Sequence, residues 1–178
     1  MCSSCERALR PPLEGAIARP ARRVIAAWQY EGAARSLILA LKLRGMRAAG
    51  GPLARGLIDA LGRAGTVASA VAWVPGRRRD VALRGFDHAE VLARTVAAHL
   101  GLPARSLLVR AADTPDQSKL TSVERAANVM GAFVAAPFDE PVLVVDDLLT
   151  TGATAGACAG ALVANGAPAV EVGVVCRA

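Results

Sequence analysis

The chain has 178 residues, of which 53% are apolar, and this fits one globular domain and excludes a disordered protein or a typical multidomain enzyme. Aromatic residues make up only 3% of the sequence, which disfavours a nucleic-acid surface that stacks bases on aromatic rings. The net charge of +6 divides into +11 for residues 1–110 and −5 for residues 111–178. A basic first half suits an anionic small molecule or a phosphate backbone. Arginine supplies 19 of the 21 cations, which favours forked phosphate contacts or reflects coding bias.

Nothing in the sequence predicts membrane insertion. The most apolar stretch, residues 155–175, is interrupted by Asn165, Pro168 and Glu171, so it falls short of the roughly 18 apolar residues of a spanning helix. The N-terminus lacks the basic start and apolar core of a secretory signal. We therefore expect a cytoplasmic protein, whose four cysteines stay as thiols.

Strand and helix patterns alternate along most of the chain. The predicted elements, in chain order, are strand 24–30, helix 33–43, helix 52–61, strand 67–74, helix 87–100, strand 106–109, strand 142–145, helix 153–165 and strand 169–175. This order predicts an α/β fold with an open, mostly parallel sheet flanked by helices. Residues 1–22 form a short cysteine-containing N-terminal appendage, and residues 23–178 form the domain.

Polar segments separate these elements. Residues 76–80 are predicted as a basic loop and residues 146–152 as a turn. In the helix that follows the basic loop, His88 is expected at the surface, and His99 is expected to be structural.

The segment 142–154 carries the most informative chemistry. A buried strand ends in Asp146 and Asp147, and a threonine-rich turn with Gly152 leads into a helix. Ligands of parallel sheets bind beyond the carboxyl ends of the strands, where a helix N-terminus favours phosphate. The two carboxylates suit paired sugar hydroxyls and positive charge on a ribose ring. The segment therefore predicts a site for a phosphorylated ribose; the alternative is an ordinary buried strand and capped helix.

This segment resembles the 5-phosphoribosyl-1-pyrophosphate (PRPP) motif of type I phosphoribosyltransferases. The resemblance implies that Asp146 and Asp147 are the catalytic acids and hold the 2′- and 3′-hydroxyls of the ribose. It assigns the 5′-phosphate to Thr150, Thr151, Gly152, Ala153 and Thr154. Purine-salvage enzymes with this motif place an acid where Thr150 stands, so purine salvage is disfavoured.

More of the chain, residues 24–178, resembles the competence-associated ComF family of phosphoribosyltransferase-like proteins. The matching blocks are 30–32, 41–45, 74–79 and 84–86, followed by Gln117, Leu120, Arg125, Asn128 and Phe133. Two departures are Leu43, which replaces an aromatic residue, and Asp87-His88, which replaces Asn-Gln.

The resemblance also implies a pyrophosphate site that includes Mg²⁺. Its candidate residues are Arg77, Arg78, Arg79, Arg84 and Lys119. Arginine and Mg²⁺ would neutralise the departing pyrophosphate. The alternative for the arginines is a solvated loop. Residues 113–119 are either a mobile hood over the substrate or a plain exposed loop.

Cys2 and Cys5 have the spacing of half a zinc site. Members of the ComF family often carry two such pairs, whereas structural zinc needs four ligands and only one pair is present here. Zn²⁺ is therefore a doubtful cofactor.

The resemblance leaves three functions open. The first is a phosphoribosyltransferase that uses PRPP and releases pyrophosphate, with an unknown acceptor. The second is a non-catalytic DNA-uptake or competence accessory protein that binds single-stranded DNA or other DNA-uptake proteins. The third is a regulator that senses PRPP.

Overall fold

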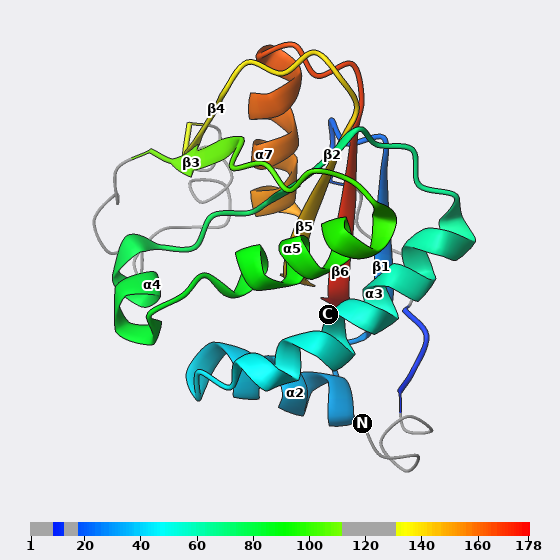
Figure 1. Cartoon of the computed structure of the whole chain (residues 1–178), viewed down its shortest axis with the longest axis vertical. Coiled ribbons are helices and arrows are strands. Elements are labelled where there is room, and N and C mark those ends of the chain that lie inside the picture. Colours follow the sequence, from blue (N-terminus) through cyan, green and yellow to red (C-terminus); the bar gives the residue numbers. More distant parts are fainter. Residues whose placement is uncertain (1–8, 13–17, 112–130) are drawn as a thin grey trace.

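A computed structural model describes residues 9–12, 18–111 and 131–178 of the chain (Figure 1). Its elements are β1 (Arg23–Gln29), α2 (Gly32–Leu43), the 3-10 helix η1 (Arg47–Ala49), α3 (Gly50–Ala64), β2 (Ala70–Trp73), α4 (Arg78–Arg84), α5 (His88–Leu100), β3 (Leu108–Arg110), β4 (Phe133–Ala135), β5 (Val142–Leu149), α7 (Ala153–Ala164) and β6 (Val170–Arg177). Among the described residues, no helix has both the length and the apolar character that crossing a bilayer requires.

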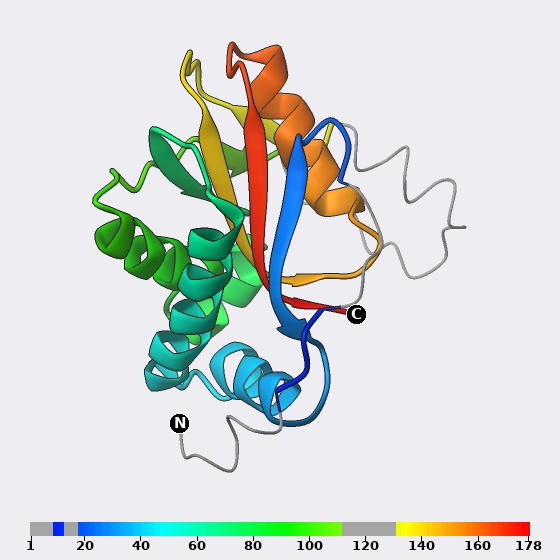
Figure 2. The same cartoon turned by 90° about the vertical axis from the view of Figure 1, so that its right-hand side faces the viewer.

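The core of the molecule is a four-stranded parallel sheet in the order β1-β6-β5-β2. Helices α2, α3 and α5 cover one face, while α7 and the small β3–β4 sheet cover the other (Figure 2). Each face of the sheet carries its own hydrophobic core: the first core lies under α2, α3 and α5, and the second lies under α7 and the β3–β4 sheet. Side chains of β5 alternate between them, because Leu143 and Val145 belong to the first core and Val142 and Val144 to the second. The predicted open parallel sheet between helical layers is confirmed.

Three expectations about local structure were wrong. Strand β5 continues beyond Val145 to Leu149, so both acids of the expected turn lie within the strand. The predicted loop 76–80 is only partly a loop, because α4 begins at Arg78. The strand predicted at 106–109 begins at Leu108 and pairs antiparallel with β4 in a separate sheet. In each case pairing or helix formation by neighbouring residues overrides the local composition.

The described parts of the N-terminal segment pack against the domain. Leu9 contacts the first core, and Ala18 and Ala21 are buried in the second. A Cβ atom on Gly156 of α7 would come within 2.7 Å of the Arg19 carbonyl oxygen, so the segment lies directly on this helix. The domain boundary at residue 22 stays a prediction.

A glycine in α3 gives a test of the packing. Gly56 lies under the indole ring of Trp28, and a Cβ atom there would overlap the ring. We expect Gly56→Ala to lower the free energy of unfolding by about 2 kcal/mol, because overpacking outweighs the gain in helix propensity. The matched control, Gly62→Ala in the same helix, meets nothing within 4 Å and should stabilise. Denaturant unfolding of both variants checks this; equal effects would contradict the packing.

Candidate functional site

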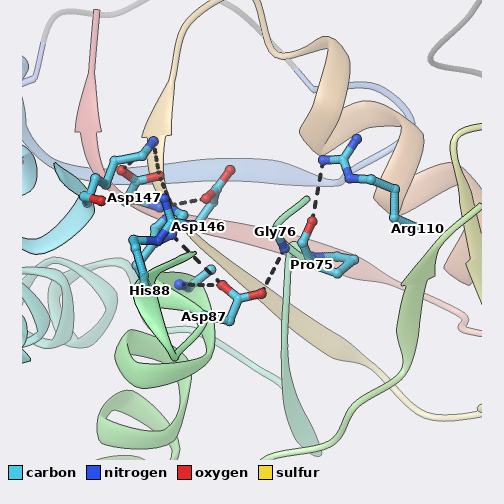
Figure 3. A network of polar contacts seen from close by, with 10 residues as sticks. Pro75, Gly76, Asp87, His88, Arg110, Asp146 and Asp147 are labelled. Atoms are coloured by element: carbon cyan, nitrogen blue, oxygen red, sulfur yellow. Dashed lines mark hydrogen bonds and ion pairs between the residues drawn. The ribbon is translucent and has the colours of Figure 1, made fainter. Parts of the chain in front are cut away.

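The candidate site lies where β5 and its neighbours reach their carboxyl ends. The Val74 amide donates to the Val145 carbonyl oxygen at 3.0 Å, so the chain leaves β2 beside the acids of β5. Pro75 and Gly76 follow at once (Figure 3). The two segments singled out from the sequence, the basic stretch and the acidic strand end, therefore meet at one edge of the sheet.

An open pocket occupies the junction of β5 and α7. It is open to solvent and is lined by Asp146 and residues 148–155. Gly152 adopts a left-handed conformation, with φ of 81°, and no side chain caps the helix at this position. The Thr151 hydroxyl accepts a bond from the Ala153 amide at 3.4 Å. Exposed hydroxyls and a helix N-terminus at one pocket make a suitable anion site.

The first acid faces this pocket. Asp146 is half-buried, and its Oδ1 accepts a hydrogen bond from the Asp147 amide at 2.8 Å. Desolvation, together with the negative charge of Asp147, raises the pKa of Asp146 well above its usual range. An acid whose charged form is disfavoured in a pocket is typical of functional sites.

The second acid lies toward the opposite face of the sheet. Asp147 is only 2% exposed, and its carboxylate oxygens lie 3.0 and 3.2 Å from Lys42 Nζ in α2. His88 Nε2 at the start of α5 lies 3.3 Å from Asp147 Oδ1. Burial alone would raise the pKa of Asp147, but the His88 hydrogen bond and the Lys42 charge lower it well below its usual range. Asp147 is therefore an ionised, partnered carboxylate.

The expected surface position of His88 was wrong. The residue is 8% exposed, and its Nε2 faces Asp147. Its Nδ1 is buried and has no hydrogen-bond partner among the described residues. His99, in contrast, is exposed on α5.

The candidate pyrophosphate residues are only partly brought to the site. Arg77, Arg78 and Arg79 are exposed where α4 begins, next to the acidic edge but outside the pocket lining. Arg84 is half-buried, and its Nη1 donates to the Lys42 carbonyl oxygen at 3.4 Å. Lys119 lies outside the described residues, as do the hood segment 113–119, the related positions Gln117, Leu120, Arg125 and Asn128, and the cysteines Cys2 and Cys5.

One group of potential metal ligands exists in the described ranges. His88, Asp146 and Asp147 each offer a ligand atom, and these atoms lie within 4.8 Å of one another. Of the other cysteines, Cys158 and Cys176 are buried as free thiols. Burial raises the pKa of Cys176 to about 12 and that of Cys158 further, so both stay protonated at neutral pH.

Sequence reasoning missed four residues of this network. Lys42 is the only charge in the apolar run 37–43, a signal that it faces something buried and negative. Asp87 begins the predicted helix 87–100, and aspartate at a helix start is typical of an N-cap. The contact between His88 and Asp147 has no local signal in the sequence. The same holds for Arg110 of β3, whose guanidinium donates to the Pro75 carbonyl oxygen.

No family model matches the chain. Two curated relatives, described as DNA utilization protein YhgH from Salmonella typhi and Salmonella typhimurium, are each 34% identical over 100 residues, which is 53% of this chain and 43% of the relative. The chain therefore spans less than half the length of these relatives.

Two solved structures are similar in fold. One, described as the allosteric regulatory enzyme of purine biosynthesis, is 19% identical over 72% of this chain and 26% of its own, with a TM-score of 0.50. The other, glutamine PRPP amidotransferase from B. subtilis complexed with ADP and GMP, is 18% identical over the same shares, with a TM-score of 0.43. The first likeness shows the fold, and the predicted type I phosphoribosyltransferase-like class is confirmed.

Proposed function

We propose that this chain, which has the fold of type I phosphoribosyltransferases, binds PRPP in the pocket between β5 and α7 and is a phosphoribosyltransferase-like protein of the ComF family. The observation that carries the proposal is the meeting of Asp146 with the N-terminus of α7 in one open pocket. The pocket thus offers a carboxylate for sugar hydroxyls and amide donors for a phosphate.

The 5′-phosphate would lie against the turn that begins α7. Thr150, Thr151 and Thr154 are exposed there and supply hydroxyl donors, while the backbone of Gly152 and Ala153 allows a close approach. Positive charge at the helix N-terminus favours the dianion. This turn therefore fixes one end of the ligand.

The ribose would lie against the two acids with different roles. Asp146 faces the pocket, so it would accept hydrogen bonds from the sugar hydroxyls and stabilise positive charge that develops on the ring as pyrophosphate departs. Asp147 is buried away from the pocket, and Lys42 and His88 engage its carboxylate oxygens, so a direct contact of Asp147 with the ribose stays a prediction. The transfer needs no protein nucleophile.

The pyrophosphate would extend toward the end of β2. Arg77, Arg78 and Arg79 are exposed beside this edge, and Arg84 and Lys119 stay predicted contacts. The residues also fit Mg²⁺, which is held in proteins by one or two carboxylates and substrate phosphates, and Asp146 Oδ2 is not used by the bond to the Asp147 amide. When bound, Mg²⁺ would neutralise charge on the leaving group.

A calorimetric titration tests the proposal. We expect saturable binding of PRPP with Mg²⁺, and weaker binding of ribose 5-phosphate at the same pocket. Heats indistinguishable from dilution for both ligands would overturn it. Pyrophosphate release over a panel of acceptor bases then separates a transferase from a protein that only senses PRPP.

Replacing Asp146 should stabilise the protein and abolish PRPP binding. The raised pKa of Asp146 means that its contribution to stability is present below the usual carboxyl range and is lost as the pH rises through the raised value. At pH 7, Asp146→Asn is therefore expected to increase the free energy of unfolding by on the order of 1 kcal/mol and to abolish PRPP binding. The exposed control Asp139→Asn should change neither. Unchanged PRPP affinity of Asp146→Asn would remove the ribose assignment.

A second candidate is a role in DNA utilization without catalysis. It is supported by the similarity to proteins described as DNA utilization proteins and by the exposed Arg77, Arg78 and Arg79, which do not line the pocket. Binding of single-stranded DNA through these arginines would weaken steeply as salt increases. Fluorescence anisotropy at several salt concentrations measures this, and salt-independent binding would contradict it.

A further inference from the structure

We propose that Asp87 and Arg110 are positioning residues that clamp the Pro75–Gly76 peptide group and thereby hold the following arginines over the pyrophosphate of bound PRPP. The inference rests on the proposed function and deepens it. It assigns the end of β2 a fixed geometry set by two charged side chains.

A single peptide group receives both contacts (Figure 3). The Gly76 amide donates to Asp87 Oδ2 at 2.7 Å, and Arg110 Nη2 donates to the Pro75 carbonyl oxygen at 3.3 Å. The two groups belong to the same planar peptide, so its rotation is opposed at both ends. Hydrogen bonds to ionised side chains are also stronger than those between neutral groups.

The two side chains reach this peptide from separate elements. Asp87 is the N-cap of α5, and its Oδ1 accepts from the Ala89 amide at 3.0 Å, so one carboxylate caps the helix and holds the loop. Arg110 belongs to β3 and stacks over the Phe133 ring at 4.6 Å, which fixes the guanidinium. The clamp therefore ties the loop to both layers around the sheet.

The clamp is also coupled to the acidic strand end. Asp87 holds the loop after β2, and the next residue, His88, lies 3.3 Å from Asp147 of β5. Two consecutive residues at the N-terminus of α5 therefore hold both segments. Arg77, Arg78 and Arg79 begin directly after the clamped peptide. Their starting direction is thus set relative to the pocket.

The space around the clamped glycine is tight. A Cβ atom on Gly76 would come within 3.0 Å of Val81 Cγ2 and 3.2 Å of Asp87 Oδ2. The Val81 side chain and the Asp87 carboxylate would each have to give way by a few tenths of an ångström to make room for the added methyl group. Gly76→Ala is therefore a way to open the clamp without changing either charged residue.

The experiment compares three ligands on three variants. Asp87→Ser keeps a cap for α5 but is too short to hold Gly76, Arg110→Met removes the other contact, and Gly76→Ala acts from the loop. For each we expect the affinity for PRPP and for pyrophosphate to fall about tenfold, while the affinity for ribose 5-phosphate stays within twofold of wild type. The exposed Arg105→Met, whose backbone pairs with Val71 in β2, is the matched control and should change nothing.

The outcomes separate this inference from the function on which it rests. Wild-type protein that binds neither PRPP nor ribose 5-phosphate overturns the proposed function. Wild-type binding of PRPP that survives all three substitutions unchanged overturns the positioning roles. Equal losses for PRPP and ribose 5-phosphate would also overturn them, because general damage to the fold does not distinguish the two ligands.

Discussion

Replacing Lys42 with methionine is expected to lower the free energy of unfolding by about 3 kcal/mol at neutral pH. The Lys42 ammonium lies 3.0 Å from a carboxylate oxygen of Asp147, whose side chain is 3% exposed. Methionine fills similar space but leaves this buried negative charge with His88 as its remaining partner. Removing one member of a buried pair is costly because the other stays desolvated.

The same variant should also change the acid sensitivity of the protein. The pKa of Asp147 is lowered in the folded state, so the stability that it contributes is present above the usual carboxyl range and is lost as the pH falls toward the lowered value. Without Lys42 the folded pKa rises, and acid unfolding should begin at a higher pH. Denaturant titrations at several pH values measure both effects. The exposed control Arg44→Met should match wild type, and Lys42→Met with wild-type stability would contradict the ion pair.

Replacing Arg23 with methionine is expected to lower the free energy of unfolding by about 3–5 kcal/mol, because it leaves a second buried carboxylate without its charged partner. Arg23 in β1 and Glu171 in β6 are directly paired in register, and the guanidinium lies 2.8 Å from Glu171 Oε1. It also donates to the carbonyl oxygens of Ala64 and Gly65 at 2.6 and 2.8 Å. One side chain therefore joins the sheet to the end of α3.

A double-mutant cycle separates the pair from these carbonyl contacts. The Glu171 side chain is 3% exposed, so Glu171→Leu combined with Arg23→Met replaces a charged pair by apolar side chains of similar size. We expect the double variant to recover most of the stability lost by Arg23→Met alone. Additive losses in calorimetric unfolding would contradict the importance of the pair.

The segment around β5 and α7 was predictable from sequence because its signals are local. An apolar run, two acids and a threonine-glycine turn lie within a dozen residues, and the structure forms strand, pocket and helix from them in that order. The parallel sheet followed from the alternation of elements.

The roles of the two acids were not predictable in the same way. Adjacent residues of a strand point to opposite faces, so once β5 extends to Leu149, Asp146 faces the pocket and Asp147 faces α2 and α5. The partners of Asp147, Lys42 and His88, come from two other elements. Such long-range contacts leave no periodic signal in the chain.

A crystal structure of the protein with PRPP and Mg²⁺ tests the central claim most directly. The account predicts the 5′-phosphate at the turn 150–154 and the ribose hydroxyls at Asp146, with the pyrophosphate on the side of β2. A PRPP molecule bound elsewhere, with the 150–154 turn and Asp146 making no contact to it, would contradict the account.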